Sequence, residues 1–496
     1  MNPVVFIPGI NRTEVLKTDE NGNFVKKVWP LAVDFSSFDK KFKFSGAKML
    51  LTGRDSGFSD ELKVFVEEYT KDFSYDHNGT TSATLALRRF DEEYFSLSNE
   101  DRSFVRKAVP LISSDIENLN TKFYFFNYNP FGNALETARA LKSFVENIKR
   151  ETGEQRIDIV SYSIGGVILR AYLDSVSDGS EIDKLVFVGS SLDGCYPVSC
   201  AFMDNISLGS VPLTEFASFV DVDISRYAFL LKSIKLNATD KAVVTAVDTV
   251  RKNMMIGSTM MWGLVPSDEF REVFNRYKND IPVPLVDEIL SFHNFTSDFC
   301  DNLNILKSHG VNIYTIAGYG RDINPIFKTQ SRSSDTLLDV TSTCPGAKFS
   351  LDSDKPLEKT PYTSPDLTVD LSQCPLRDTT WLFKGQSHHA IRSNDIISLL
   401  VCKILSGEVT DIYSDAALPQ FNVSRNVRKI HSSLHRAQEL LNTDLSTEAR
   451  EEIEAAVKRV RDALSDTVAT TEKNEALYAL NAELNNILEK NSKGKN

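Results

Sequence analysis

Apolar residues in the first part of the chain are grouped into short, uninterrupted runs. Four such runs precede residue 190, and two more follow at Ile313–Ala317 and Thr380–Phe383. The first four, rich in β-branched and aromatic side chains, are Val4–Ile7, Phe123–Tyr128, Ile157–Val160 and Leu185–Val188. Continuous apolar runs of this length are typical of strands buried on both faces of a parallel sheet.

The segments between these runs have the spacing of helices. In segment 134–148 one face carries Leu135, Ala138, Leu141, Val145 and Ile148, which is the pattern of an amphipathic helix. A second helix is predicted from about Gly165. Alternating strands and helices predict an α/β fold, with a doubly wound, mostly parallel sheet and right-handed crossovers.

The alternation stops between residues 197 and 305, where the spacing is helical and the apolar content is high. The large apolar residues of this segment are Phe216, Phe219, Tyr227, Phe229, Met254, Met255, Met260, Met261 and Trp262. We predict a helical cap or lid inserted over the sheet. Its apolar residues either line a site for an acyl chain or form the insertion's own core.

The chain becomes charged and rich in Ala, Glu and Lys after about residue 420. Three apolar stripes follow at helical spacing: Ile430, Leu434, Ala437 and Leu441; Ile453, Val457, Val460 and Leu464; Leu477, Leu480, Leu484 and Ile487. They predict a three-helix bundle over residues 424–490, with Ser446 and Thr471 as N-caps. Residues 491–496 are expected to be a disordered tail.

Charge and composition exclude several classes of protein. The 496 residues carry a net charge of −12 without a Lys- or Arg-rich run, which argues against nucleic acid as a partner. No apolar run approaches the roughly 20 residues that span a bilayer, so no transmembrane segment is expected. The N-terminus lacks the features of a signal peptide; the protein is expected outside the cell or at its surface if a signal was removed, and in the cytoplasm otherwise.

Six cysteines are too few for a disulfide scaffold, and none lies in a C-x-x-C pair. A zinc site is therefore not expected, and the chain is predicted to need no metal and no cofactor. Cys195–Cys200 and Cys344–Cys374 are candidate disulfides in an oxidising compartment. Buried thiols are the alternative.

The stretch "RIDIVSYSIGGVILRAYL" runs from a predicted strand into a predicted helix through Ser163. It resembles the G-x-S-x-G nucleophile elbow, in which small residues flank a serine on a strained turn. Ser161 stands at the first glycine position and Gly165 at the second. The alternative is an ordinary strand–helix turn with a capping serine.

Other segments supply the groups that an activated serine needs. Pro8-Gly9 ends the first strand, and the N–H groups of Ile10 and Ile164 are the predicted oxyanion hole. The late segment "WLFKGQSHHAI" offers His388 or His389 as the base. An acid between serine and histidine would follow the Ser…Asp…His order of α/β-hydrolases. The candidates are Asp322, Asp366 and Asp378, and position after a strand favours Asp322.

From the first strand to about residue 405 the chain resembles the lecithin:cholesterol acyltransferase-like lipases and acyltransferases. The matching stretches are "VVFIPGINRTEVLKTDENGNFVKKVWP", "TGEQRIDIVSYSIGGVILRAYL", "GSTMMWGLVPS", "PDLTVDLSQ" and "SHHAI". The resemblance implies an α/β-hydrolase fold with a catalytic triad of Ser163, Asp366 and His388. Tyr162 stands where the family has histidine, and the glycines that flank the family's acid and the proline that follows it are absent at the matching positions around Asp366.

These observations predict an α/β-hydrolase catalytic domain over residues 1–420, including the cap at 197–305. The predicted activity is that of a serine-dependent lipid ester hydrolase or acyltransferase, similar to lipases and phospholipases. The partner is a lipid or other acyl ester, at a lipid surface if the substrate is aggregated. The alternative is a non-catalytic lipid- or carbohydrate-binding protein on a degenerate hydrolase fold. The C-terminal bundle faintly resembles FIVAR-type modules, which implies binding to a surface partner.

Overall fold

The structure is a computed structural model of the 496-residue chain. It describes residues 1–31, 44–48, 52, 54–109, 119–204, 240–319, 348–349, 369–370, 376, 379–384, 388–392, 394–407, 437, 440–441, 445–465 and 471–492. Everything below concerns these residues.

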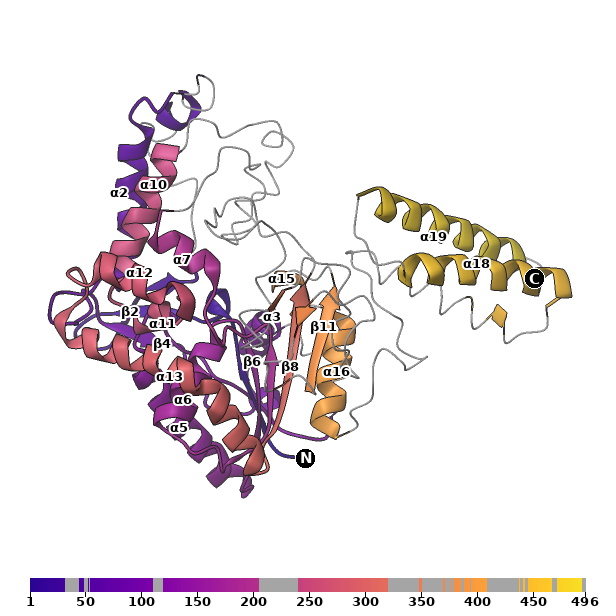
Figure 1. Ribbon diagram of the computed structural model, residues 1–496, viewed down its shortest axis with the longest axis horizontal. Coiled ribbons are helices and arrows are strands. Elements are labelled where there is room, and N and C mark those ends of the chain that lie inside the picture. The colour runs from indigo at the N-terminus through magenta and orange to yellow at the C-terminus, as the bar shows by residue number, and fades with distance from the viewer. Residues whose placement is uncertain are drawn as a thin grey trace.

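A six-stranded sheet forms the centre of the molecule (Figure 1). In spatial order its strands are β11 (Thr380–Lys384), β8 (Asn312–Tyr319), β7 (Ile182–Val188), β6 (Ile157–Tyr162), β1 (Val4–Ile7) and β5 (Phe123–Phe125). Every neighbouring pair is parallel. All six strands lie at the predicted places, and the predicted α/β fold with a parallel sheet is confirmed.

One strand is shorter than its apolar run. β5 ends at Phe125, whereas the apolar run extends to Tyr128. The buried Asn127 side chain accepts from the N–H of Glu14 and donates to the carbonyl groups of Glu14 and Arg88. These bonds take the chain out of the sheet.

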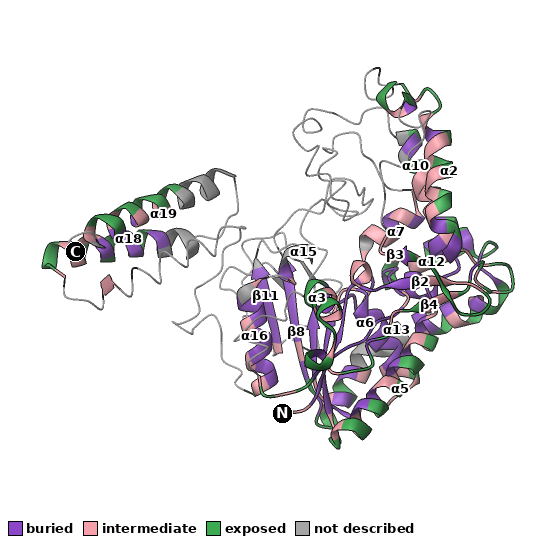
Figure 2. Cartoon of the chain, turned by 180° about the vertical axis from the view of Figure 1, so that it is seen from behind, coloured by how far each residue is buried: buried purple, intermediate pink, exposed green. Residues whose placement is uncertain are grey.

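Helices cover both faces of the sheet. On one face α5 (Ala134–Thr152), α6 (Gly165–Ser175) and α13 (Val283–Ser308) pack in a core with alternate strand residues such as Val5, Ile159 and Phe187. On the other face α3 (Asn99–Ala108) and α16 (Asp395–Ser406) pack with the opposite set, such as Phe6 and Val186. Figure 2 shows the strands buried between these layers. The sheet is therefore doubly wound, as predicted.

The predicted helical segment 197–305 contains α7 (Tyr196–Phe202), α10 (Asp240–Val250), a π-helical turn (Arg251–Met255), α11 (Thr259–Trp262), α12 (Ser267–Tyr277) and α13. Met254, Met255, Met260, Met261 and Trp262 are all buried in the same core as the sheet. For these residues burial in a core accounts for the apolar pattern. Phe216, Phe219, Tyr227 and Phe229 lie outside the described residues.

A small antiparallel sheet, which the sequence did not indicate, stands beside the main one. Its strands are β3 (Phe24–Trp29), β2 (Val15–Thr18) and β4 (Leu85–Leu87), in that order. α2 (Phe58–Thr70) lies side by side with α10 (Figure 1). Shorter elements are three 3-10 helices, Ile10–Arg12, Lys71–Phe73 and Tyr94–Ser96, the pair β9 (Lys348–Phe349) and β10 (Val369–Asp370), and α15 (His388–Ile391).

Two helices of the predicted C-terminal bundle are described, α18 (Thr447–Ser465) and α19 (Thr471–Ser492). They share a small core of their own that includes Ile453, Val460 and Leu484. Ser446 caps α18, since its hydroxyl accepts from the N–H of Ala449 at 3.2 Å. Thr471 is the first residue of α19, so the prediction that it is the N-cap is wrong by one position. The first predicted helix lies mostly outside the described residues.

Within the described part of the chain, no helix is both long enough and apolar enough to cross a membrane.

Candidate active site

Ser163 occupies a strained turn between β6 and α6. Its φ is +58°, a left-handed conformation that costs a non-glycine residue about 1–2 kcal/mol. The turn is held to the loop after β7: the Ser163 N–H donates to the Gly189 carbonyl at 3.2 Å, and its own carbonyl accepts from the Ser191 N–H at 2.8 Å. Strain maintained by such contacts is concentrated at functional sites.

The residues around Ser163 are small because the chain leaves no space. A Cβ added at Gly165 would lie 2.8 Å from Ser161 Oγ, and one at Gly166 would lie 2.8 Å from the Ser191 carbonyl oxygen. The side chain of Ser161 is buried, and its Oγ lies 3.1 Å from Ser190 Oγ. A serine is therefore tolerated at the first glycine position because its hydroxyl has a hydrogen-bond partner there.

His388 and Ser163 lie side by side near the carboxyl ends of the strands that precede them. Its Nε2 lies 2.9 Å from Ser163 Oγ, although the two residues are 225 positions apart. β6 delivers the serine at its carboxyl end, and β11 ends a few residues before α15 begins at the histidine. A hydroxyl and an imidazole at this distance are within reach for direct proton transfer.

Tyr162, the residue before the serine, contacts the same histidine twice. Its hydroxyl donates to the carbonyl oxygen of His388. The two rings stack with their centroids 5.0 Å apart and their planes 23° apart. Sequence reasoning noted Tyr162 only as a departure from the resembled family and missed this contact.

The loop after β1 lies directly against Ser163. A Cβ added at Gly9 would lie 2.8 Å from the Tyr162 ring and 3.1 Å from Ser163 Cβ. The loop is fixed from outside by Tyr128, whose hydroxyl donates to the Pro8 carbonyl at 2.5 Å, a contact that the sequence alone did not reveal. Burial raises the pKa of the Tyr128 hydroxyl well above its ordinary value, so it remains a donor.

The two predicted oxyanion-hole groups flank this contact. The carbonyl of Ile10 accepts from Trp29 Nε1 at 2.6 Å, which fixes the orientation of that residue. Ile164 is the N-cap of α6. Among the residues that the structure describes, the backbone N–H groups of Ile10 and Ile164 have no hydrogen-bond acceptor. They remain available to a developing negative charge.

The three candidate acids, Asp366, Asp322 and Asp378, all lie outside the described residues, as does the side chain of His389.

A buried arginine supports the loop that holds the elbow. Arg170 of α6 donates from Nη1 to the Leu192 carbonyl at 2.6 Å and lies 4.6 Å from the Phe292 ring centroid. Burial lowers the pKa of its guanidinium to about 10. Burial also raises the pKa of the neighbouring Asp193, although the charge of Arg170 opposes that shift. These contacts join α6 to the loop after β7.

His293 belongs to the core and not to this site. Its Nε2 lies 2.8 Å from the Trp262 carbonyl oxygen, and its ring stacks on Phe270. Burial, helped by the nearby charge of Arg170, lowers its pKa to about 3. His293 is therefore neutral in the folded protein at ordinary pH.

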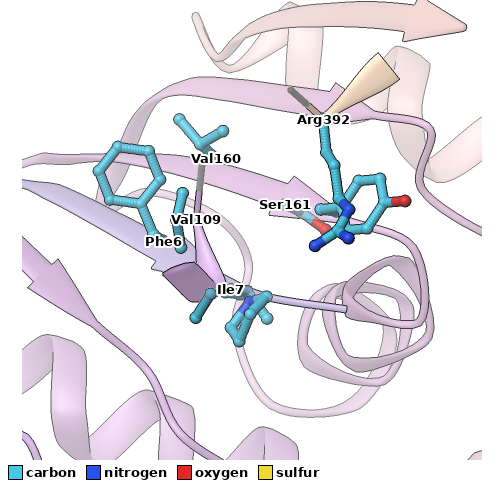
Figure 3. Close-up of a pocket in the computed structure, with 9 residues that line it drawn as sticks. Phe6, Ile7, Val109, Val160, Ser161 and Arg392 are labelled. Carbon is cyan, nitrogen blue, oxygen red and sulfur yellow. The ribbon is translucent and has the colours of Figure 1, made fainter. Parts of the chain in front are cut away.

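A narrow pocket opens beside the elbow at the ends of β1 and β6 (Figure 3). Its nine lining residues are mostly apolar, with Arg392 at one side. The Nε of Arg392 is buried without a hydrogen-bond partner among the described residues. The space holds about one water molecule, too little for an acyl chain.

The described ranges contain neither a cluster of metal ligands nor the disulfide that the cysteine spacing suggested. No group of three or more His, Cys, Asp or Glu side chains is placed there to hold a metal ion. Cys195 and Cys200 do not form the disulfide that their spacing allowed. Cys344 and Cys374 lie outside the described residues.

Comparison with known proteins gives weak likenesses only. No family model matches the chain, and no curated protein matches it. The crystal structure of the Tle4–Tli4 complex matches with 11% identity over 82% of this chain and 98% of the other, at a TM-score of 0.33. A carboxylesterase structure from the ammonia-oxidizing thaumarchaeon Nitrososphaera gargenis matches with 8% identity over 82% of this chain and 90% of the other, at a TM-score of 0.26. Scores this low assign neither a family nor an activity.

Proposed function

We propose that this protein is a serine-dependent carboxylic ester hydrolase of the lipase or phospholipase type, with a lipid or other acyl ester as substrate. One observation carries the proposal: Ser163, on a left-handed turn at the carboxyl end of β6, lies 2.9 Å from His388 Nε2. A capping serine in an ordinary turn needs neither the strain nor the imidazole.

The proposed reaction proceeds through an acyl-serine. His388 accepts the proton of Ser163 as the serine oxygen attacks the ester carbonyl. The N–H groups of Ile10 and Ile164 stabilise the oxyanion, and their lack of other acceptors in the described chain supports this role. The alcohol leaves with the proton from His388, and water then attacks the acyl-serine. A lipid alcohol in place of water would make the same protein an acyltransferase.

We propose Asp366 as the acid that orients His388, on the family resemblance of "PDLTVDLSQ". An acid in this place fixes the imidazole tautomer and stabilises the imidazolium. Asp366→Asn should lower kcat by about 10⁴-fold, whereas Asp322→Asn and Asp378→Asn should change it less than about tenfold. If the large loss falls on Asp322 or Asp378 instead, the assignment of Asp366 is wrong.

The proposed division of the chain follows the same argument. Residues 1–420 form the catalytic unit, with 197–305 as its cap, and 424–490 form a helical bundle. The helix α19 continues to Ser492, so it includes the first two residues of the predicted tail 491–496. The separate core of α18 and α19 supports the bundle as an independent unit. We propose that the bundle binds a surface partner and takes no part in the chemistry.

The decisive experiment is covalent labelling. A fluorophosphonate probe should label the intact chain at Ser163, as read by peptide mass spectrometry, and Ser163→Ala should abolish the labelling. Turnover of p-nitrophenyl esters with short and long chains should fall by about 10³-fold or more in that variant. A non-catalytic binding protein, the competing function, would give neither labelling nor turnover. Product analysis with and without a sterol acceptor separates hydrolysis from transfer.

A further inference from the structure

Tyr162 is placed to control the geometry of the imidazole. Its hydroxyl donates to the His388 carbonyl oxygen, and its ring stacks on the imidazole. The first contact holds the backbone at the start of α15, and the second limits rotation of the imidazole. Together they restrict both the position and the tilt of the group that faces Ser163.

Tyr162 is next to Ser163 in the sequence, so one turn fixes the positions of both residues. Tyr162 and Ser163 are consecutive, so the same turn that holds the nucleophile also presents the ring that holds the base. β6 is paired on both sides, with Ser161 opposite Ile7 and Tyr162 opposite Val188. The tyrosine therefore stands at the end of a strand that is paired on both sides, whereas α15 is a single four-residue turn.

The rings of Tyr162 and His388 both pack close to the backbone of Gly189. A Cβ added at Gly189 would lie 3.6 Å from His388 Nδ1, 3.6 Å from Tyr162 Cε2 and 3.3 Å from Ile391 Cγ2. Gly189 itself accepts the hydrogen bond of the Ser163 N–H. The nucleophile, the imidazole and the tyrosine ring thus meet around one backbone segment.

We propose that Tyr162 is a positioning residue for His388, acting through the stacked ring and the hydroxyl-to-carbonyl hydrogen bond. This inference rests on the proposed function. When the imidazole takes the proton of Ser163 Oγ, a cation forms against the ring, and aromatic faces attract cations. Because that charge exists only as the reaction proceeds, the contribution of Tyr162 falls on kcat and not on substrate binding.

The test compares four variants of the full chain. Tyr162→Phe keeps the ring and removes the hydroxyl, Tyr162→His keeps an aromatic ring, and Tyr162→Leu removes the ring. Tyr277→Phe is the matched control, since the Tyr277 hydroxyl also donates to a buried carbonyl, that of Phe202, at 2.6 Å. Steady-state kinetics with a p-nitrophenyl ester and the rate of fluorophosphonate labelling are measured for each.

We expect kcat to fall about two- to tenfold in Tyr162→Phe and about 10- to 100-fold in Tyr162→Leu, with KM within about twofold of wild type. The labelling rate should fall in parallel, and Tyr162→His should recover part of the loss seen with leucine. Tyr277→Phe should keep the wild-type kcat. An unchanged kcat in Tyr162→Leu, or a change confined to KM, overturns the proposal.

A variant that does not fold and a wild type without activity have different meanings for the proposal. If Tyr162→Leu does not fold, as judged by circular dichroism, the kcat of Tyr162→Phe relative to wild type and Tyr277→Phe decides the matter. If wild type itself shows neither turnover nor labelling, the proposed function has failed and the positioning role fails with it. A failure of the positioning role alone is seen as full activity in both wild type and the Tyr162 variants.

Discussion

Replacing Ser163 by glycine should make the protein more stable than replacing it by alanine. Both changes remove the hydroxyl, so they differ only in the Cβ atom. At a φ of +58° the Cβ costs about 1–2 kcal/mol. Glycine loses about 0.5–1 kcal/mol more chain entropy on folding. The net expectation is that Ser163→Gly exceeds Ser163→Ala by about 0.5–1 kcal/mol in free energy of unfolding.

Urea unfolding followed by tryptophan fluorescence measures this difference. The chain has three tryptophans, and Trp29, Trp262 and Trp381 are all buried in the cores around the two sheets, so the signal reports this unit and not α18 and α19. The control is the same pair of substitutions at Ser143, an exposed residue within α5. There glycine should be less stable than alanine by about 1 kcal/mol.

The test is whether the difference in free energy of unfolding between the glycine and alanine variants has opposite signs at Ser163 and Ser143. If Ser163→Gly is no more stable than Ser163→Ala while the Ser143 pair behaves as expected, the turn is not strained. The physical argument for an elbow at Ser163 would then be lost. Neither variant at Ser163 should hydrolyse esters, so a difference in stability cannot be confused with a difference in activity.

Three further outcomes are expected. Gly166→Ala should destabilise the protein by about 2–4 kcal/mol in urea, because the new Cβ would lie 2.8 Å from the Ser191 carbonyl oxygen; a loss below about 1 kcal/mol would contradict the packing. Gly9→Ala should lower kcat more than stability, because its Cβ would meet the Tyr162 ring at 2.8 Å; an equal kcat would mean that the loop moves freely. His293 has a folded pKa of about 3, below its unfolded value of about 6.5, so the unfolded chain binds the extra proton first and stability falls as pH drops below about 6.5. From pH 7 to pH 4 the free energy of unfolding of the wild type should fall by up to about 3 kcal/mol relative to that of His293→Gln. If urea unfolding shows the same pH dependence for both proteins, the lowered pKa of His293 is refuted.

The sheet was predictable because both of its faces are buried. Strands such as β1 and β7 need apolar residues at every position, so their pattern is continuous and easily found. The antiparallel sheet was missed for the opposite reason. β3 is lysine-rich and leaves Phe24 and Val25 exposed, and irregularities in its pairing with β2 break the regular alternation. No simple periodicity remains in the sequence.

The site was partly predictable, and the limit lies in long-range contacts. Ser163 is found because the elbow imposes small residues within two positions of it, a local constraint. The role of Tyr128 depends on a hydrogen bond to a backbone carbonyl 120 positions away, and that of Tyr162 on a histidine 226 positions away. Backbone carbonyls have no residue-specific signature, so nothing in the sequence marks such pairs.

The distance along the chain between the serine and the histidine has a consequence for synthesis. The Ser163 hydroxyl emerges from the ribosome early, whereas the His388 imidazole arrives 225 residues later, on α15, which follows the edge strand β11. A nascent chain or a truncated product that stops between them carries the nucleophile without its partner. Such an incomplete product is therefore expected to lack the proposed esterase activity until the last strand of the sheet and α15 have been made.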